Sequence, residues 1–464
     1  MTIDLITVVI YALAMLAIGW FAMRRAKTRE DYLVAGRNLG PSMYAATLST
    51  VILGGASTLG TVRLGYVYGI SGLWFCTMMG LGIMIISLFL SKHLLNLKLF
   101  TVTELLERRY NPAARFSSSL IMVVYALMVA VVSVVATATI LNGIFDIDFW
   151  KGVLLGGGIV VIYSTIGGMW SITLTDIVQF IIMTVGIMFL LMPLSINQAG
   201  GWNALVSALP ETHFSMINIG WPLLIGYFLN YFLGIMIGQD IWQRVFTARS
   251  IGVAKYAGAA AGLYCVLYGV CGALIGMAGR VLIPELENVN DAFAKIAQAS
   301  LPDGIRGLVV AAALAALMST ASAAMMAAAS TIAQDILPTV RKQQSSLNTN
   351  RIATLVAGLL TLALSLVLND VFKPLTVAYN LLVGCMMVPL VGAIYWKRSN
   401  TTAALFSMAL SALVTLFFLW KDGMDANTPI FYGLGTSIVS FVLISLLTRN
   451  TEPSAVNGLE SEMR

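Results

Sequence analysis

Two adjacent hydroxyl side chains, Ser319 and Thr320, lie within residues 311–335, a stretch made almost entirely of small and apolar side chains. The stretch can cross a bilayer, for which about 20 apolar residues suffice. Its alanines and serines would let other helices approach closely. The two hydroxyls either bond to carbonyls one turn earlier in their own helix or supply oxygen ligands to a small hard cation such as Na⁺.

Glycines interrupt two other apolar stretches. Gly54 and Gly55 are adjacent in the first, and each weakens a helix by about 1 kcal/mol relative to alanine. The second has its own glycines beside polar side chains: Gly226, Asn230, Tyr231, Gly234 and Gly238. Interrupted spans at matching positions of two halves indicate inverted repeats with a site near the bilayer midplane. Close helix packing is the alternative explanation for each glycine.

Asp176 follows Thr175 at the start of an apolar stretch, and we expect it to be the one carboxylate within the membrane-embedded sequence. Burying an unpaired carboxylate costs several kcal/mol, which makes an intramembrane acid a candidate functional residue. A helix N-terminal acid favoured by the macrodipole is the alternative.

The composition is that of a membrane protein. The 464 residues are 59 % hydrophobic and only 10 % charged, and the mean hydropathy is +0.88. We therefore expect one polytopic transmembrane domain over residues 1–447, with a first helix that is retained in the membrane. The net charge of +6 bears on topology and does not indicate a nucleic-acid partner. The cysteines all lie in apolar stretches and predict no disulfide.

We predict 13 membrane spans from the apolar periodicity. They cover about 4–24, 42–63, 69–92, 116–144, 150–167, 173–197, 217–238, 252–280, 305–336, 350–370, 373–396, 400–420 and 427–447. Seven basic residues then fall in outer segments and the remaining 20 of the 27 in inner ones. By the positive-inside rule, the N-terminus is outside and the C-terminus cytoplasmic.

Two connections have helical character. Residues 101–110 begin with Thr101 followed by Glu104, a capping-box pattern that predicts a short cytoplasmic interfacial helix. Residues 288–303 form an outer loop with a helical pattern, which either covers a vestibule or only connects. Residues 448–464 are expected to be a short cytoplasmic tail.

Several motifs together resemble those of the sodium:solute symporter family, which includes the bacterial proline, pantothenate and sialic acid symporters and the sodium/glucose cotransporters. The matching segments are Asp31–Arg37 (DYLVAGR), Ile166–Ser171 with Thr175, Asp176 and Gln179, Gln239–Arg244 (QDIWQR) with Ala248–Ser250 and Lys255, and Ala316–Thr320 (ALMST). The combination is specific to that family, and its 13-span topology agrees with our count.

The resemblance implies an all-α fold of the LeuT type. A leading helix at 4–24 would precede a five-plus-five inverted repeat from about 42 to 396, and trailing helices would occupy 400–447. It also implies a main sodium site built from backbone carbonyls and hydroxyls. These are the carbonyls of Thr50, Leu53 and Ala316 and the hydroxyls of Ser319 and Thr320. Neutral oxygens suit Na⁺, a hard cation.

Some members of the family hold a second sodium ion between the aspartate of the Thr-Asp motif and serines near the main pair. Asp176, Ser319 and Ser322 match that pattern, but Ala323 stands where those members have another serine. Asp176 and Ser322 are therefore expected either to form a second sodium or coupling site or to leave Asp176 as an electrostatic partner.

The expected solute pocket departs from that of the sugar carriers. Ser57 and Cys76 align where the sugar carriers have Gln and Glu, and Gly234 falls near their inner-gate tyrosine, which argues against a hexose. The remaining candidate pocket residues are Tyr125, Asn230, Tyr231, Thr376, Tyr379 and Asn380. Arg63, at the outer end of the interrupted span, either attracts an anionic solute or extends to the interface.

These features predict a sodium-coupled importer of a small organic solute in a bacterial plasma membrane, with Na⁺ as the coupling ion and no organic cofactor. We favour an organic acid or an amino-acid-like solute. A proton-coupled symporter and a transporter-like solute sensor are the alternatives. Only His93 and His213 are present as histidines, which argues against an enzyme. The expected partners are the solute and the lipid bilayer, and the chain is expected to be a monomer or a loose homo-oligomer.

Overall fold

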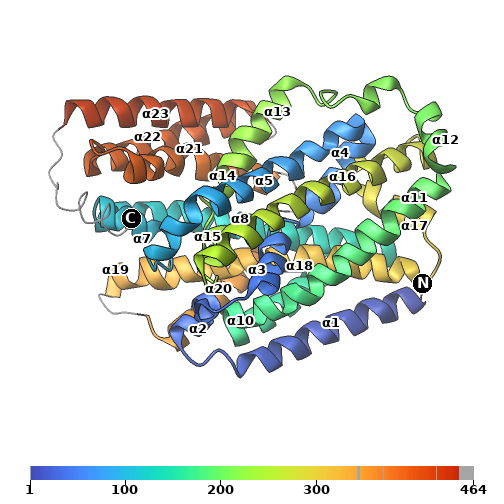
Figure 1. Cartoon of the computed structure of the whole chain (residues 1–464), viewed down its shortest axis with the longest axis horizontal. Helices are drawn as coiled ribbons and strands as arrows, with labels where there is room; N and C mark the ends of the chain where they lie inside the picture. The colour runs from blue at the N-terminus through green and yellow to red at the C-terminus, as the bar shows by residue number, and fades with distance from the viewer. Residues whose placement is uncertain (1, 342–344, 369, 372, 425, 449–464) are drawn as a thin grey trace.

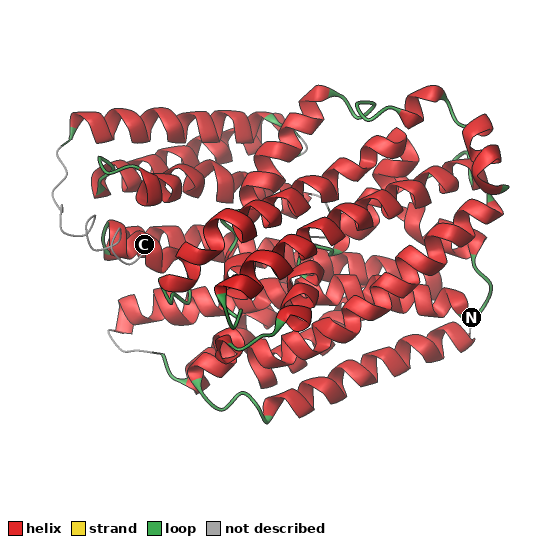
Figure 2. Ribbon diagram, viewed as in Figure 1, coloured by secondary structure: helices red, strands yellow, loops and turns green. Residues whose placement is uncertain are grey.

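The computed structural model of the chain consists of helices joined by loops (Figure 2). It describes residues 2–341, 345–368, 370–371, 373–424 and 426–448. The long helices are α1 (Thr2–Met23), α8 (Pro112–Phe145), α10 (Gly158–Met183), α16 (Gly258–Leu282), α18 (Ile305–Thr331), α20 (Leu347–Val367), α21 (Lys373–Tyr395), α22 (Thr401–Asp422) and α23 (Thr428–Leu447). Shorter ones are α2 (Arg29–Val34), α5 (Trp74–Ile85), α6 (Ser91–Asn96), α7 (Val102–Arg109), α9 (Phe149–Gly152), α11 (Met192–Gln198), α12 (Gly201–Ala208), α17 (Ala292–Ser300) and α19 (Leu337–Arg341).

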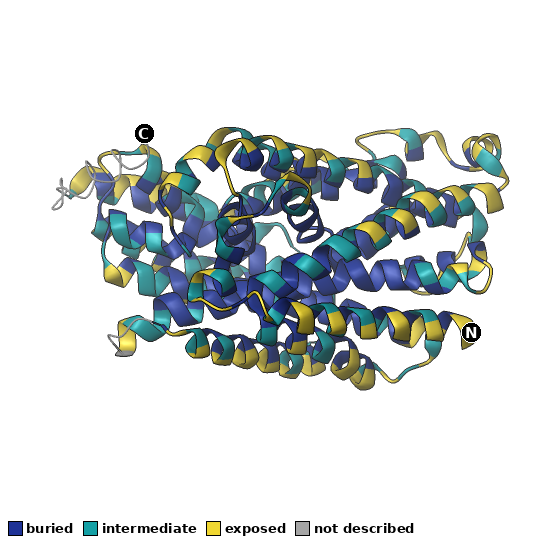
Figure 3. Cartoon of the chain, turned by 60° about the horizontal axis from the view of Figure 1, so that its bottom comes forward, coloured by how far each residue is buried: buried dark blue, intermediate teal, exposed yellow. Residues whose placement is uncertain are grey.

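Helix α18 forms the centre of the bundle. Every residue from Val309 to Thr331 is buried, and α1, α8, α10 and α20 pack against it. Its small side chains allow this, because helices in a membrane associate by close packing. The exposed residues lie on the outer faces of the surrounding helices (Figure 3). Helices α22 and α23 pack against each other at one edge of the bundle (Figure 1).

Ten helical runs in the described residues are long and apolar enough to cross a membrane, or 11 if one bent pair counts as a span. Two of the runs, Gly55–Asn96 and Phe149–Gln198, have 42 and 50 residues, about twice the ~20 that one crossing needs. The predicted spans 42–63 and 69–92 overlap the first of these runs, and 150–167 and 173–197 the second. The total of 13 stays a prediction, as do the inverted repeat over 42–396 and the orientation of the termini.

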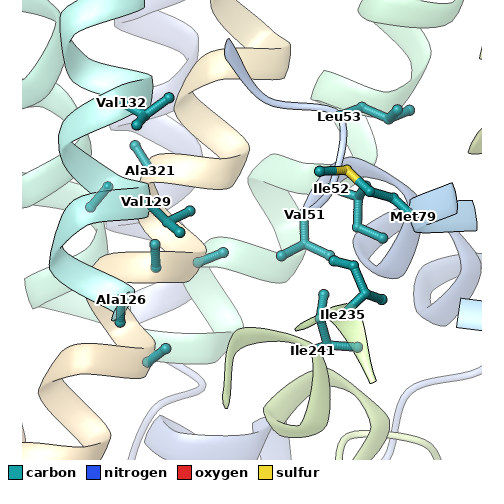
Figure 4. Close-up of a cluster of buried hydrophobic side chains, with 14 of the residues drawn as sticks. Val51, Ile52, Leu53, Met79, Ala126, Val129, Val132, Ile235, Ile241 and Ala321 are labelled. Atoms are coloured by element: carbon teal, nitrogen blue, oxygen red, sulfur yellow. The ribbon is translucent and has the colours of Figure 1, made fainter. Parts of the chain in front are cut away.

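Both predicted helix interruptions are confirmed. Helix α3 (Pro41–Thr50) ends before residues 51–54, and α4 (Gly55–Tyr68) begins after them. The second interrupted span begins with α13 (Trp221–Tyr227), which a π-helical turn joins to α14 (Leu233–Ile235). The chain then bends by 45° before α15 (Gln239–Val245). Side chains of the 51–54 segment, α5, α14 and α15 meet around the first break (Figure 4).

The two helical connections are also present. Thr101 is the N-cap of α7, and its side chain accepts a hydrogen bond from the Glu104 amide. The Glu104 carboxylate accepts a hydrogen bond from the Phe100 amide. Five of the eight residues of α7 are buried against the protein, and its place at the membrane interface stays a prediction. Helix α17 forms within the predicted outer loop. The predicted tail lies outside the described residues except for Thr448. The four cysteines are free and buried.

Gly168 bends α10 where the sequence predicts a boundary between two spans. Its φ of 55° lies in the left-handed region, which glycine adopts without the steric cost that a Cβ imposes. A Cβ at this position would also lie 2.6 Å from both the ring and the carbonyl oxygen of Tyr32. The Tyr32 hydroxyl lies 3.0 Å from the carbonyl oxygen of Thr165, so α2 packs directly on the bend.

We expect Gly168→Ala to lower the stability of the purified protein by roughly 1–3 kcal/mol, because both the backbone and the Tyr32 contact become strained. Thermal unfolding in detergent measures this. Gly158→Ala is the matched control, because a Cβ on Gly158 at the start of the same helix meets nothing within 4 Å. Equal unfolding temperatures for the two variants would contradict the role given to Gly168.

Candidate functional site

The Ser319 and Thr320 hydroxyls of α18 face the end of α3 across the helix break. Ser319 Oγ lies 3.0 Å from the carbonyl oxygen of Thr50 and 2.8 Å from that of Ala316. Thr320 Oγ1 lies 2.8 Å from the Val51 carbonyl oxygen and 3.4 Å from that of Thr50. Ser319 thus bonds to a carbonyl of its own helix, as one explanation expects, and also reaches the broken span; the role of the two hydroxyls as cation ligands stays a prediction.

These contacts bring together four of the five predicted sodium ligands. The fifth is the Leu53 carbonyl, which belongs to the unwound segment 51–54 between α3 and α4. It accepts a hydrogen bond from Thr58 Oγ1 at 3.2 Å. The Val51 carbonyl is an additional oxygen that the sequence did not identify. The group consists of neutral oxygens at the C-terminal end of α3, where the helix dipole favours a cation. Its chemistry therefore suits a hard monovalent cation.

Gly54 allows α18 to approach the break. A Cβ on Gly54 would lie 2.5 Å from Thr320 Oγ1 and 2.6 Å from Thr320 Cβ. A Cβ on Gly55 would lie 2.8 Å from the Ala136 Cβ of α8. The two glycines thus serve both purposes weighed from the sequence: they interrupt the helix and permit close packing.

Asp176 of α10 is fully buried, and side chains of α3 and α15 contact its carboxylate. Its Oδ2 accepts from Thr47 Oγ1 and lies 3.2 Å from Arg244 Nη2, and Arg244 is also fully buried. Arg244 Nε donates to the Thr47 carbonyl at 3.0 Å, which ties α15 to α3. Ser322 Oγ donates to the carbonyl of Ser319 at 2.9 Å. The predicted second site at Asp176 and Ser322 stays a prediction.

The expectation that Asp176 is the one membrane-embedded carboxylate is wrong. Asp4, Asp240 and Asp335 are also buried within or beside the apolar helices. Asp4 pairs with Arg306 at 2.6 Å, and Asp335 pairs with Arg115 at 2.7 Å. Basic partners distant in the sequence make this burial tolerable, and sequence reading that treats helix ends as loops overlooks them.

A small central cavity adjoins the hydroxyl pair. It has a volume of about 30 Å³, enough for roughly one or two water molecules. Its walls include Gly54, Gly55, Ser57, Ser133, Asp240, Thr320 and Tyr379. Asp240 Oδ1 accepts from the Tyr125 hydroxyl at 3.1 Å. Asp240 and Ser133 are not among the pocket residues predicted from the sequence, although Asp240 belongs to the QDIWQR motif.

A second cavity, of about 230 Å³, lies at the other end of α4. Its lining includes the predicted residues Arg63, Asn230, Tyr231 and Thr376. Asn230 Oδ1 is buried with no hydrogen-bond partner among the described residues. This cavity therefore holds both a cationic and several polar side chains.

Tyrosine rings stand between the two cavities. The Tyr231 and Tyr379 ring centroids are 5.1 Å apart, and those of Tyr379 and Tyr125 are 5.3 Å apart. Gly234 makes room for this arrangement, because a Cβ there would lie 2.3 Å from the Tyr379 ring. Tyr231 lines the larger cavity and Tyr379 the central one, so the contact of these two rings separates the cavities.

The remaining pocket candidates are differently placed. Ser57 lines the central cavity and its hydroxyl donates to the Ile52 carbonyl. Cys76 Sγ lies 3.1 Å from Thr61 Oγ1 and does not line either cavity. Asn380 is fully buried, and its amide has no partner among the described residues. It too lies outside both linings.

A polar network surrounds Asp335, in the turn that follows α18. Asp335 accepts from Thr101 Oγ1 at 2.9 Å and Thr103 Oγ1 at 2.6 Å, in addition to Arg115. Gln239 of α15 accepts from the Val102 amide at 2.8 Å. These bonds join α7, α8, α15 and the end of α18 on the side predicted to be cytoplasmic.

Comparison with known proteins gives consistent results. The model of the sodium:solute symporter family matches residues 32–411. The osmoregulated proline transporter OpuE of Bacillus subtilis is 26 % identical over 96 % of this chain and 95 % of its own length. The sodium/sialic acid symporter NanT of Aliivibrio fischeri is 27 % identical over 99 % and 95 %.

Solved structures share the fold. An outward-open Na⁺-coupled sialic acid symporter superposes with a TM-score of 0.85 at 21 % identity and covers 97 % of this chain and 98 % of its own. Mhp1, a nucleobase-cation-symport-1 family transporter, superposes with a TM-score of 0.60 at 17 % identity over 93 % and 98 %. The coarse prediction of an all-helical LeuT-type fold is confirmed.

The buried pair of Arg244 and Asp176 can be tested by a double-mutant cycle. Arg244→Gln leaves Asp176 buried without its basic partner, and we expect a loss of stability of about 3–5 kcal/mol. Adding Asp176→Asn removes the unpaired charge and should recover most of that loss in denaturation of the purified protein. A double variant as unstable as Arg244→Gln alone would show that the charge pair is not the cause.

Proposed function

Because the chain belongs to the sodium:solute symporter family, we propose that it imports a small organic solute together with Na⁺ by alternating access. The contact of Ser319 and Thr320 with the carbonyls of Thr50 and Val51 carries this proposal. This contact supplies neutral oxygens from α18 and from the end of α3. An ion can be bound between them only while the two helices keep a fixed distance from each other. The protein is a multi-pass membrane protein, and the distribution of basic residues supports an outside N-terminus.

In this mechanism, Na⁺ from outside bridges the unwound segment 51–54 to α18 and stabilises the state that accepts solute. Its affinity must differ between the two states, since an indifferent ligand shifts no equilibrium. One Na⁺ crossing ~100 mV releases about 2.3 kcal/mol, and a tenfold concentration gradient adds about 1.4 kcal/mol. Together these support a few-hundred-fold accumulation of solute.

We assign Asp176 the role of electrostatic partner to Arg244. It then does not form a second sodium site, and one Na⁺ enters per cycle. The ion pair at 3.2 Å and the bond of Ser322 to its own helix support this assignment. Proton coupling through Asp176 is the alternative, favoured by the fact that its Oδ1 is buried without a partner among the described residues.

For the solute, we favour an amino-acid-like molecule over a simple organic acid. Two of the compared relatives are named as transporters of proline and of sialic acid, and the central cavity holds a carboxylate, Asp240. Arg63 in the outer cavity supports attraction of the solute's carboxylate. A sensor that binds the solute without moving it is the second candidate from the sequence.

We expect Ser319→Ala and Gly54→Ala to raise the half-saturating Na⁺ concentration at least ~tenfold, equivalent to ~1.4 kcal/mol, or to abolish uptake. The first variant removes a ligand, and the second forces α18 away from the break. The measurement is uptake into proteoliposomes across a panel of amino acids, organic acids, sugars and nucleobases, with inward Na⁺ or K⁺ gradients.

Gly435→Ala is the matched control, because a Cβ on Gly435 meets nothing within 4 Å. Uptake that ignores Na⁺ but collapses with the pH gradient would replace sodium by proton coupling. Solute binding without any accumulation would favour the sensor. Sodium-dependent uptake that survives Ser319→Ala unchanged would refute the proposed site.

A further inference from the structure

The charges buried beside the central cavity do not balance. Asp176 and Asp240 are both buried, and one buried guanidinium, that of Arg244, lies close to them. Arg244 pairs with Asp176 at 3.2 Å, whereas its contact with Asp240 is to the backbone carbonyl, at 3.4 Å. The Asp240 carboxylate makes no ion pair among the described residues. An ionised Asp240 would therefore carry a negative charge without a basic partner, which a protein interior disfavours.

Asp240 presents this charge to the cavity. It is among the lining residues, and the Tyr125 hydroxyl holds its Oδ1 at 3.1 Å. Gly238 leaves space for the carboxylate, since a Cβ there would lie 2.7 Å from Asp240 Oδ1 and 2.9 Å from the Tyr125 hydroxyl. The carboxylate is therefore held in one place by its surroundings.

Other groups around the cavity suit a positively charged nitrogen. Ser133 is buried, lines the cavity, and its hydroxyl has no hydrogen-bond partner among the described residues. Tyr379 also lines the cavity, and an aromatic face attracts a cation. An ammonium group donates charge-assisted hydrogen bonds to a carboxylate and ordinary ones to a hydroxyl.

Another part of the cavity wall has the reverse polarity. Gly54 is the N-cap of α4 and provides no side-chain cap, so the first amides of α4 and the positive end of its dipole are available there. Gly54, Gly55 and Ser57 all line the cavity. A molecule with a positive and a negative end would match both walls.

We propose that Asp240 binds the ammonium group of the transported solute, which is an amino or imino acid. This inference rests on the proposed function, because it treats the central cavity as the solute site. The cavity of about 30 Å³ must widen to admit the solute, and displacement of the Tyr379 ring provides the room. The solute's ammonium then neutralises the charge that Arg244 leaves on Asp240.

The first test uses pairs of solutes that differ only at the nitrogen: L-proline with tetrahydrofuran-2-carboxylate, and L-alanine with L-lactate. Wild-type protein in proteoliposomes is given an inward Na⁺ gradient and a wider panel of amino acids, betaines, sugars and carboxylates. We expect every accumulated solute to carry a positively charged nitrogen. Its oxygen analogue should compete at least ~tenfold more weakly.

The second test uses Asp240→Asn, which keeps the shape of the side chain and removes its charge. We expect the KM for the solute to rise at least ~tenfold while the half-saturating Na⁺ concentration stays within ~twofold of wild type. Asp148→Asn is the matched control, because Asp148 is exposed and lies outside both cavities. Asp240→Glu, which restores the charge, should recover part of the affinity.

The outcomes separate the inference from the proposed function. Na⁺-dependent accumulation of only uncharged or anionic solutes would overturn the inference and leave sodium symport intact. Accumulation of no solute with Na⁺ would count against both. An Asp240→Asn variant with an unchanged KM, or with a changed Na⁺ dependence alone, would assign the carboxylate to a structural or sodium-binding role. The solute pairs decide the matter even if the variants fail to fold.

Discussion

The contact between the α18 hydroxyls and the unwound segment 51–54 is the constraint on which the rest of this structure depends. Helix α3 ends at Thr50 and leaves backbone carbonyls at membrane depth, where lipid offers them no partner. Ser319 and Thr320 lie within 3.0 Å of the Thr50 and Val51 carbonyls, respectively. The same oxygens are the neutral ligands that a hard cation prefers, so the groups that make the break tolerable are also those of the proposed sodium site.

This contact dictates the composition of α18. A helix that meets a broken helix on one side and α8 and α10 on the others has little room for large side chains; all residues from Val309 to Thr331 are buried, and most of them are small. The requirement extends to Gly54 and Gly55, whose missing side chains set the distance to Thr320 and Ala136. The alanine-rich stretch noticed first in the sequence is therefore a consequence of packing around the break.

Local signals in the sequence predicted the breaks, the hydroxyl pair and the α7 cap, because each depends on residues within a few positions of one another. Among contacts between distant residues, only those that the family resemblance implied were expected: the contact of Tyr125 with Asp240, which spans 115 positions, and that of Arg244 with Asp176, which spans 68, were missed. The Val51 carbonyl was missed because only the path of the unwound chain decides which oxygen faces Thr320. The number of spans depends on bends such as that at Gly168, whose φ of 55° no pattern of apolar residues encodes.

In the mechanism proposed above, coupling between ion and solute follows from a wall that the two proposed sites share. Val51 and Thr320 belong to the hydroxyl–carbonyl contact and also line the central cavity with Asp240. An ion that fixes α18 against the break therefore fixes one wall of the solute cavity, and no long-range pathway is required. Gln239, next to Asp240, accepts from the Val102 amide of α7, and Asp335 accepts from Thr103 of the same helix and pairs with Arg115. Because α15 carries both Asp240 and Gln239, a solute that binds the first residue acts on the short helix that also holds this network closed. Solute binding at Asp240 and the hydrogen bond of Gln239 to α7 thus meet in the first turn of α15.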